Sequence, residues 1–155
     1  MKETITISNR FFRNFFSDSM PIENSFSEDL AFKKNGLNSF NVKREGKRFI
    51  EIDFRGYIYK ENVLAGKILG AWYNSDDWRI VFDQSEYALV GASGNAAIMK
   101  NGEAIIGKIS VTPAILFLGC ELSAGFDSVI EKWPVVILSI LSWDSNASPR
   151  HSIGA

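Results

Sequence analysis

Residues 133–143 read WPVVILSILSW and end a longer apolar stretch that begins at Phe126. The run is apolar on nearly every face of a helix, so protein or lipid must surround it. It is too short to span a bilayer, which needs about 20 apolar residues. A helix enclosed by strands is the simplest arrangement that buries such a run.

The start of this helix allows two arrangements. Ser128 and Glu131 have the spacing of a capping box, but Pro134 would then fall inside the helix, where it costs about 3 kcal/mol. Either a short turn over residues 126–132 precedes a helix with Pro134 at its first position, or the helix is kinked. We expect a kink or break near Trp133.

The region before the helix has the alternation of half-buried antiparallel strands. From Leu37 onward, apolar residues such as Ile50 and Ile52 alternate with polar residues such as Glu51 and Asp53. Further short apolar runs cover residues 57–59, 63–69, 78–82, 87–90, 96–99, 104–111 and 114–118. Turn signals separate several of these runs, at Glu45-Gly46, Arg55-Gly56 and, most strongly, Asn101-Gly102.

A weak internal repeat lies within this region. Ile58-Tyr59-Lys60 leads to Gly66-Lys67-Ile68, and Ile98-Met99-Lys100 leads to Gly107-Lys108-Ile109, with offsets of 40 and 41 residues. The repeat indicates one β-hairpin used twice, which is common in meanders and closed barrels, although chance similarity is a fair alternative.

The N-terminal segment is less regular. Thr4–Ile7 alternates as a short strand does, whereas Arg10–Phe16 fits a helical turn with an aromatic face as well as a strand. Ser17–Asp29 is predicted to be a loop. We therefore expect a single domain over residues 1–143, with its core at about 37–143, an N-terminal part at 1–36 that is partly irregular, and a flexible tail at 144–155.

The composition is that of a globular protein of 155 residues, with 23% charged and 46% hydrophobic residues. A single cysteine, Cys120, rules out an intramolecular disulfide and fits a reducing compartment. The N-terminus has no apolar core of signal-peptide length. These features predict a cytoplasmic protein without a transmembrane span.

Motifs for catalysis or metal binding are weak. One histidine, His151, and one cysteine cannot build a zinc site, and Gly91–Asn95 lacks the final glycine of a nucleophile elbow. Glu51 and Asp53 share a strand face and could act as an acid–base pair. Polar residues that alternate with apolar ones are, however, found on any solvent-exposed strand face. We expect no catalytic residues, no metal and no cofactor, and rank a hydrolase-type enzyme a distant third.

Basic residues form the best candidate binding site. Residues 33–67 carry nine basic and four acidic side chains, a net charge of +5, whereas residues 68–155 carry a net charge of −4. Two Lys/Arg pairs flank the turn at Glu45-Gly46, where a hairpin tip could present them to phosphate groups. The predicted site comprises Lys43, Arg44, Lys47, Arg48 and Arg55, and a solvated hairpin end is the alternative.

The order of the elements resembles the tubby-like superfamily, which includes the LURP-one-related and phospholipid-scramblase-like proteins. A β meander with repeated hairpins leads into AILFLGCEL (residues 114–122), a polar break and then the apolar helix, so the resemblance covers about Lys47 to Trp143. It implies a closed antiparallel barrel around a hydrophobic C-terminal helix, and a non-enzymatic scaffold for anionic lipid. The chain departs from the family at Gly119–Leu122, where an aromatic-Pro-acidic-Leu pattern is usual, and at Pro134.

The predicted fold is mainly β, a closed antiparallel β-barrel wrapped around the C-terminal helix. The alternative is an α+β domain, with the helix on one face of an open antiparallel sheet. We expect a non-catalytic binding or scaffold protein that contacts anionic phospholipid through the basic hairpin. The alternative is a protein–protein adaptor or inhibitor that uses exposed aromatics such as Phe11, Phe12, Phe15 and Phe16. The net charge of −1 makes nucleic acid an unlikely partner.

Overall fold

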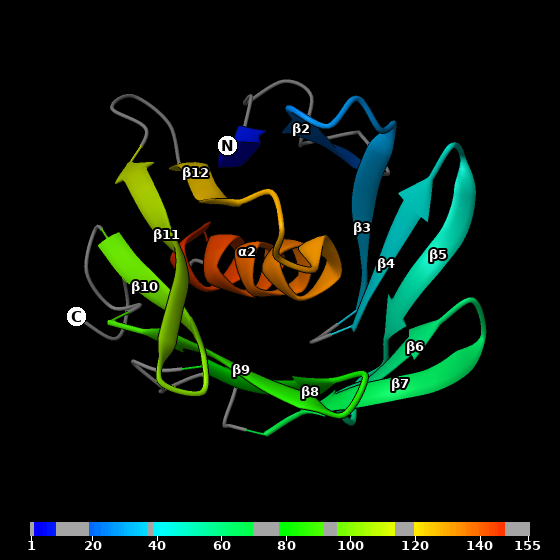
Figure 1. Cartoon of the computed structure of the whole chain (residues 1–155). Helices are drawn as coiled ribbons and strands as arrows, with labels where there is room; N and C mark the ends of the chain where they lie inside the picture. Colours follow the sequence, from blue (N-terminus) through cyan, green and yellow to red (C-terminus); the bar gives the residue numbers. More distant parts are fainter. Residues whose placement is uncertain are drawn as a thin grey trace.

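Twelve antiparallel strands form a closed barrel around one C-terminal helix (Figure 1), as predicted, and the open-sheet alternative is wrong. This computed structural model describes residues 2–8, 19–36, 39–69, 78–91, 96–113 and 120–147. The elements are β1 (Lys2–Ser8), β2 (Met20–Asn24), β3 (Leu30–Gly36), β4 (Ser39–Arg44), β5 (Lys47–Ile52), β6 (Tyr57–Lys60), β7 (Val63–Ile68), β8 (Trp78–Phe82), β9 (Ser85–Val90), β10 (Ala96–Asn101), β11 (Ala104–Pro113), β12 (Cys120–Asp127) and helix α2 (Lys132–Ala147).

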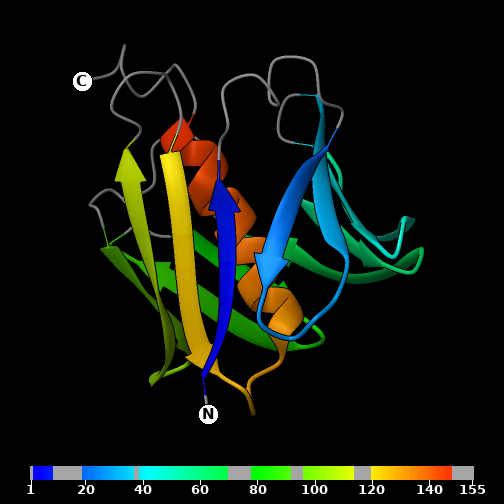
Figure 2. The same cartoon turned by 90° about the horizontal axis from the view of Figure 1, so that it is seen from above.

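Each strand pairs with its neighbours in the chain, and β1 closes the barrel against β12. This closing ladder runs from Lys2 opposite Asp127 to Ser8 opposite Glu121, and Figure 2 shows the two strands side by side. The N-terminal part is therefore more regular than predicted. The predicted strand at Thr4–Ile7 is confirmed within β1, the predicted loop at 17–29 contains β2, and the barrel does not begin at residue 37.

Alternating side chains of the strands line the interior and enclose α2. Val135, Val136, Ile137 and Leu138 are fully buried, as are inward residues of the strands such as Ile50. In Figures 1 and 2 the strands surround the helix, which runs through the barrel from one end to the other. Burying an aliphatic side chain contributes about 1.5–3 kcal/mol, so the helix is a principal source of stability.

The bounds of the helix differ from the prediction. Phe126 still belongs to β12, and α2 runs without a break from Lys132 to Ala147. Pro134 is its third residue, where a backbone N–H would have no acceptor within the helix, so the proline needs no kink. The expected break near Trp133 is thus wrong.

The predicted flexible tail at 144–155 is also wrong over its first residues. Asp144 lies in the last turn of α2, where it is buried and its Oδ1 accepts a hydrogen bond from Lys34 Nζ at 3.1 Å. The buried Ser139 hydroxyl is likewise satisfied, because it donates to the Val135 carbonyl at 2.7 Å. Residues 148–155 lie outside the described residues.

The predicted repeat corresponds to two hairpins with the same register. In the β6–β7 hairpin, Ile58 lies opposite Gly66, and the pairing register shifts by one residue immediately after this pair. In the β10–β11 hairpin, Met99 lies opposite Gly107, and the register shifts by one residue at the same point. The equivalent residues of the two hairpins are therefore 41 positions apart in the sequence on both strands, so Met99 rather than Ile98 corresponds to Ile58. The β4–β5 hairpin has the same shift. The three shifts leave one residue each unopposed, and all three pack on or in the core: Phe49, Ala65 and Ile106.

Candidate functional site

Four of the five predicted site residues meet at one hairpin tip. Lys43 lies opposite Arg48, and Arg44 lies opposite Lys47, across the two-residue turn at Glu45-Gly46. Both turn residues have positive φ, 53° and 77°, as the tight hairpin turn requires. Arg55 follows the other end of β5, about 20 Å away at 3.3 Å per residue. The structure therefore does not bring Arg55 to the predicted tip.

Arg44 remains exposed, but its guanidinium lies against the start of the helix. Its guanidinium lies 5.1 Å from the Phe49 ring centre and 6.0 Å from that of Trp133, and 3.3 Å from Glu28 Oε1. Lys132 Nζ lies 3.0 Å from the other oxygen of Glu28. Glu28 thus joins two cations beside the Trp133 ring, and we assign Arg44 a structural role.

Only part of the predicted positive charge is unpaired. Arg48 lies 3.1 Å from Glu51, and Arg55 lies 2.9 Å from Asp53. Among the described residues, neither Lys43 nor Lys47 has an acidic oxygen within 4.0 Å. Both lysines are exposed. These two are the cations of the tip that an external anion can meet without breaking an ion pair.

Asp53 organises the turn that carries Arg55. One carboxylate oxygen accepts hydrogen bonds from the backbone N–H groups of Arg55 (2.9 Å) and Tyr57 (3.1 Å), and the other accepts two from the Arg55 guanidinium. Burial alone would raise the pKa of Asp53, but these hydrogen bonds and the charge of Arg55 outweigh it and lower the pKa. The ionised carboxylate therefore stabilises the fold.

The change Asp53→Asn should remove this charge-dependent part of the stability. Because the folded-state pKa of Asp53 is lowered, its contribution is complete above the unfolded-state pKa, near 3.9, and is lost as the pH falls through the folded-state value. At pH 7 we expect the variant to lose about 1 kcal/mol of unfolding free energy, measured by urea denaturation. The difference should shrink below pH 4.

Glu51→Gln is the matched control on the same strand, because Glu51 has one exposed ion pair and no described backbone hydrogen bond to its carboxylate. It should change the unfolding free energy by less than Asp53→Asn at pH 7. A difference between wild type and Asp53→Asn that stays constant from pH 7 to pH 3 would contradict the role given to the carboxylate.

A column of basic and aromatic side chains continues from Arg55 along the outside of β6 and β7. The Tyr57 ring lies 5.0 Å from the Arg55 guanidinium and 5.2 Å from Lys67 Nζ. Tyr57 is opposite Lys67 in the ladder, which places both on one face. Lys67 was not among the predicted site residues, although the spacing of Tyr57 and Lys67 around the hairpin could have indicated it.

Large apolar side chains are exposed next to these charges. Phe54 is 70% exposed beside Arg55, and Val63 and Leu64 are 67% and 57% exposed at the tip of the β6–β7 hairpin. The aromatics predicted to be exposed, Phe11, Phe12, Phe15 and Phe16, lie outside the described residues. Exposed apolar groups beside cations are typical of surfaces that meet a partner.

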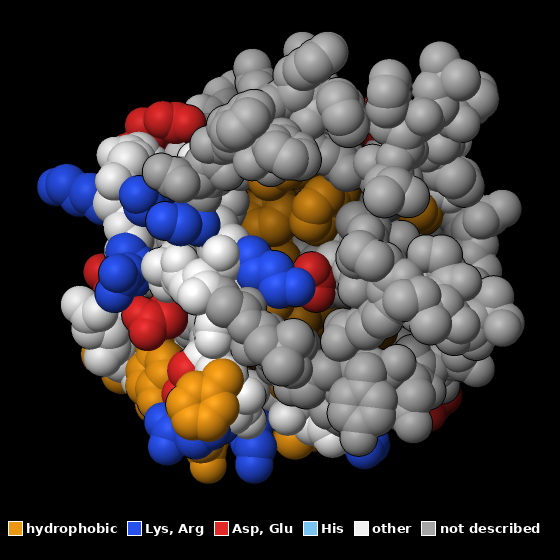
Figure 3. Space-filling view, turned by 180° about the vertical axis from the view of Figure 1, so that it is seen from behind, with side chains coloured by type: hydrophobic (Ala, Val, Ile, Leu, Met, Phe, Trp, Pro, Cys, Tyr) orange, Lys and Arg blue, Asp and Glu red, His pale blue; other side chains and the backbone are white. Residues whose placement is uncertain are grey.

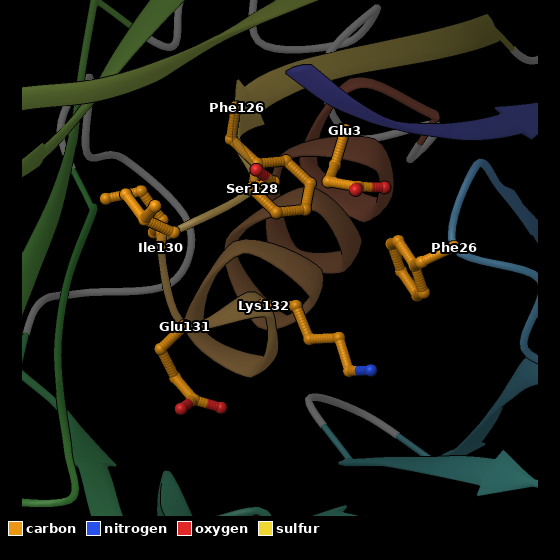
Figure 4. A pocket seen from close by; sticks show the side chains of 8 residues that line it. Glu3, Phe26, Phe126, Ser128, Ile130, Glu131 and Lys132 are labelled. Carbon is orange, nitrogen blue, oxygen red and sulfur yellow. The ribbon is translucent and has the colours of Figure 1, made fainter. Parts of the chain in front are cut away.

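A cavity of about 430 Å³ opens beside the start of α2. Glu3, Phe26, Phe126 and Lys132 are among its lining residues, and Figure 4 shows Lys132 extending toward Phe26 while Glu131 points elsewhere. Lys132 Nζ lies 4.8 Å from the Phe26 ring centre and is paired with Glu28. Lys132, the basic residue that lines this cavity, is thus already paired with an acidic residue of the protein itself.

The acid–base alternative finds no support in the geometry. Glu51 and Asp53 each face their own arginine, and the neighbouring Ile50 and Ile52 point into the core. The lowered pKa of Asp53 is the opposite of what a general acid at neutral pH needs. The described contacts of these two carboxylates are thus with arginines and backbone N–H groups, and not with each other.

Comparison with known proteins finds no family model, no curated protein and no solved structure that matches this chain. Within the part of the chain that the structure describes, no helix is both long enough and apolar enough to cross a bilayer.

Proposed function

We propose that this protein is a non-catalytic binding protein that contacts anionic phospholipid at a membrane surface through its β4–β5 hairpin. One observation carries the proposal: the β4–β5 hairpin, with the exposed and unpaired Lys43 and Lys47 near its tip, is next to the β6–β7 hairpin, which exposes Val63 and Leu64. The two tips are neighbours, because Ile50 lies opposite Lys60 and the Glu61 N–H donates to the Phe49 carbonyl at 2.8 Å.

The combination suits an anionic bilayer for physical reasons. Each basic residue near an anionic leaflet contributes about 1 kcal/mol, and this attraction decays within a Debye length. Aliphatic side chains that enter the boundary between headgroups and acyl chains add a hydrophobic contribution that salt does not screen. Two unpaired lysines alone would bind weakly, so Val63 and Leu64 are essential to the proposal.

The membership in the tubby-like superfamily and the cytoplasmic location are also proposals. The order of a closed barrel followed by an enclosed apolar helix supports the first. The single cysteine and the anionic character of the cytoplasmic leaflet support the second. No lipid-binding residue is carried over from the superfamily.

The test is flotation of the full chain with phosphatidylcholine vesicles, with and without phosphatidylserine, over a salt series. The double variant Lys43→Glu, Lys47→Glu should lose binding to anionic vesicles by about tenfold or more, since two charges change sign. Arg44 is left unchanged because it holds Glu28 and contacts Trp133.

The control is Lys100→Glu, Lys108→Glu, which makes the same change of charge on β10 and β11, across the barrel. This variant should bind as wild type does. Absence of binding at low salt, or equal loss in both variants, would overturn the proposal and leave a protein partner as the leading hypothesis.

A further inference from the structure

The outer face of strands β4–β7 combines basic, aromatic and aliphatic side chains. The ladders place Glu51 opposite Tyr59, Tyr59 opposite Leu64, and Tyr57 opposite Lys67, so these side chains share one face. Lys43 and Arg48 form a pair on the same face nearer the β4–β5 tip. We name this surface the β4–β7 wall, and it consists of Lys43, Arg48, Glu51, Tyr57, Tyr59, Leu64 and Lys67, with Asp53, Phe54 and Arg55 at its edge.

The charge of the β4–β7 wall is positive. Four basic residues (Lys43, Arg48, Arg55 and Lys67) accompany two acidic ones (Glu51 and Asp53), a net charge of +2. Figure 3, seen from behind, shows Lys and Arg side chains gathered on the left, the side of β4–β7, with hydrophobic side chains among them below. This distribution complements a sheet of anionic groups.

Apolar side chains mark both ends of the wall. Phe54 is 70% exposed in the turn between β5 and β6, and Leu64 is 57% exposed near the opposite end of β6. The four residues of β6 lie between them, which separates the two side chains by about 13 Å. Tyr57 and Tyr59 lie between the two ends, and tyrosine favours the level of the lipid headgroups.

We propose that the barrel lies side-on against an anionic bilayer, with the β4–β7 wall facing the lipid and Phe54 as a second apolar anchor. This inference rests on the proposed function and extends it, since the hairpin tips alone would allow the barrel to stand upright. Side-on contact brings Arg55 and Lys67 to the headgroups together with Lys43. It also makes the axis of α2 run roughly parallel to the membrane.

A bilayer fits this surface better than a single-stranded nucleic acid does. Bases could stack on Phe54, Tyr57 or Tyr59, but the exposed aliphatic side chain of Leu64 offers no ring and suits acyl chains instead. The far side of the barrel also differs, because the outward residues of β1, β11 and β12 include the exposed Thr4, Ser110 and Ser123. That side also exposes Lys108 and Ile105 on β11, but among its described residues it lacks the aromatic side chains that accompany the cations of the β4–β7 wall.

The experiment places an environment-sensitive fluorophore on single cysteines in a Cys120→Ser background, since Cys120 is the one cysteine of the chain. Labels at Phe54→Cys, Leu64→Cys and, as the control, Ser110→Cys on β11 are compared with phosphatidylserine-containing vesicles. Side-on binding should shift the emission of the first two labels to the blue with a several-fold gain in intensity, and should leave the third unchanged.

The outcomes separate the inference from the proposed function. A response at Leu64→Cys without one at Phe54→Cys means tip-on binding, which overturns the side-on orientation while the proposed function stands. No response at either site together with no flotation overturns both. A response at all three sites means that the protein inserts without a preferred face, which also overturns the inference.

A second measurement does not depend on labels. Phe54→Ser should weaken binding to anionic vesicles about tenfold, whereas Val90→Ser, which removes an apolar side chain 39% exposed on β9, should not. Because Phe54 is largely exposed, its replacement leaves the core intact. Equal binding by both variants, or oligonucleotide binding that requires Phe54 without any lipid binding, would overturn the inference.

Discussion

Replacing Ile137 with aspartate is expected to prevent the chain from folding. Ile137 is fully buried in α2, inside the barrel. The substitution removes about 1.5–3 kcal/mol of hydrophobic burial and adds several kcal/mol for a buried carboxylate without a partner. The sum approaches or exceeds the total stability of an ordinary domain, about 5–15 kcal/mol. The expected result is insoluble protein, or soluble protein that melts without a cooperative transition in thermal denaturation.

The matched control is Ile137→Val, which removes one methylene group and should lower the unfolding free energy by only about 0.5–1.5 kcal/mol. It should remain soluble and melt cooperatively. A soluble Ile137→Asp variant with a cooperative transition close to that of wild type would show that α2 does not lie within the barrel.

The second large effect is expected for Gly66→Ala on β7. A Cβ atom on Gly66 would overlap the backbone carbonyl of Val81 on the neighbouring strand, and backbone atoms cannot move aside as a flexible side chain does. The β7–β8 ladder would have to separate around Phe82. Overpacking costs about 1–3 kcal/mol, and we expect a loss of unfolding free energy at the upper end of that range, measured by urea denaturation.

Two other glycines make this prediction specific. Gly107→Ala, at the equivalent position of the β10–β11 hairpin, should have a similar effect because its Cβ would overlap the Gly125 carbonyl. Gly125→Ala should be neutral or slightly stabilising, since nothing lies within 4 Å of its Cβ and the substitution restricts the unfolded chain. Equal stability of Gly66→Ala and Gly125→Ala would contradict the close approach of β7 and β8.

The sequence predicted the fold well where side-chain alternation was regular. Trp78–Phe82 was predicted with the bounds that the structure gives, because one face of that strand is buried and the other is wet. The apolar run at 133–143 predicted the enclosed helix because a ring of strands is the simplest arrangement that buries all of its faces. The closed barrel therefore followed from the helix as much as from the strands.

The prediction failed where tertiary contacts override local pattern. Pro21 made residues 17–29 resemble a loop, yet Met20–Asn24 is a strand that pairs with β3 and, briefly, with β1. The polar Asp144 resembled the start of a tail, but its carboxylate is buried and forms an ion pair with Lys34, 110 residues away in the chain. Neither the pairing of Met20–Asn24 with β3 nor the ion pair of Asp144 with Lys34 can be predicted from residues that are close in sequence.

The candidate site was predicted in part for the same reason. The turn at Glu45-Gly46 correctly gathered Lys43, Arg44, Lys47 and Arg48 at one tip. The register shift after Val42, which leaves Phe49 unopposed and against Trp133, cannot be predicted from composition. The pairing of Arg44 with Glu28 cannot be predicted from composition either. The separation of Arg55 from the tip follows simply from the length of β5.

The closure of β1 on β12 has a consequence for how the chain folds during synthesis. Thr4 lies opposite Gly125, so about 120 residues must be made before β1 meets this partner. Its other neighbour, β2, pairs with it at only two positions, so most backbone groups of β1 have no strand partner until then. Contacts between such distant residues slow folding, and an open strand edge invites association between chains. The finished barrel has no free edge, whereas a growing chain carries one until β12 has left the ribosome.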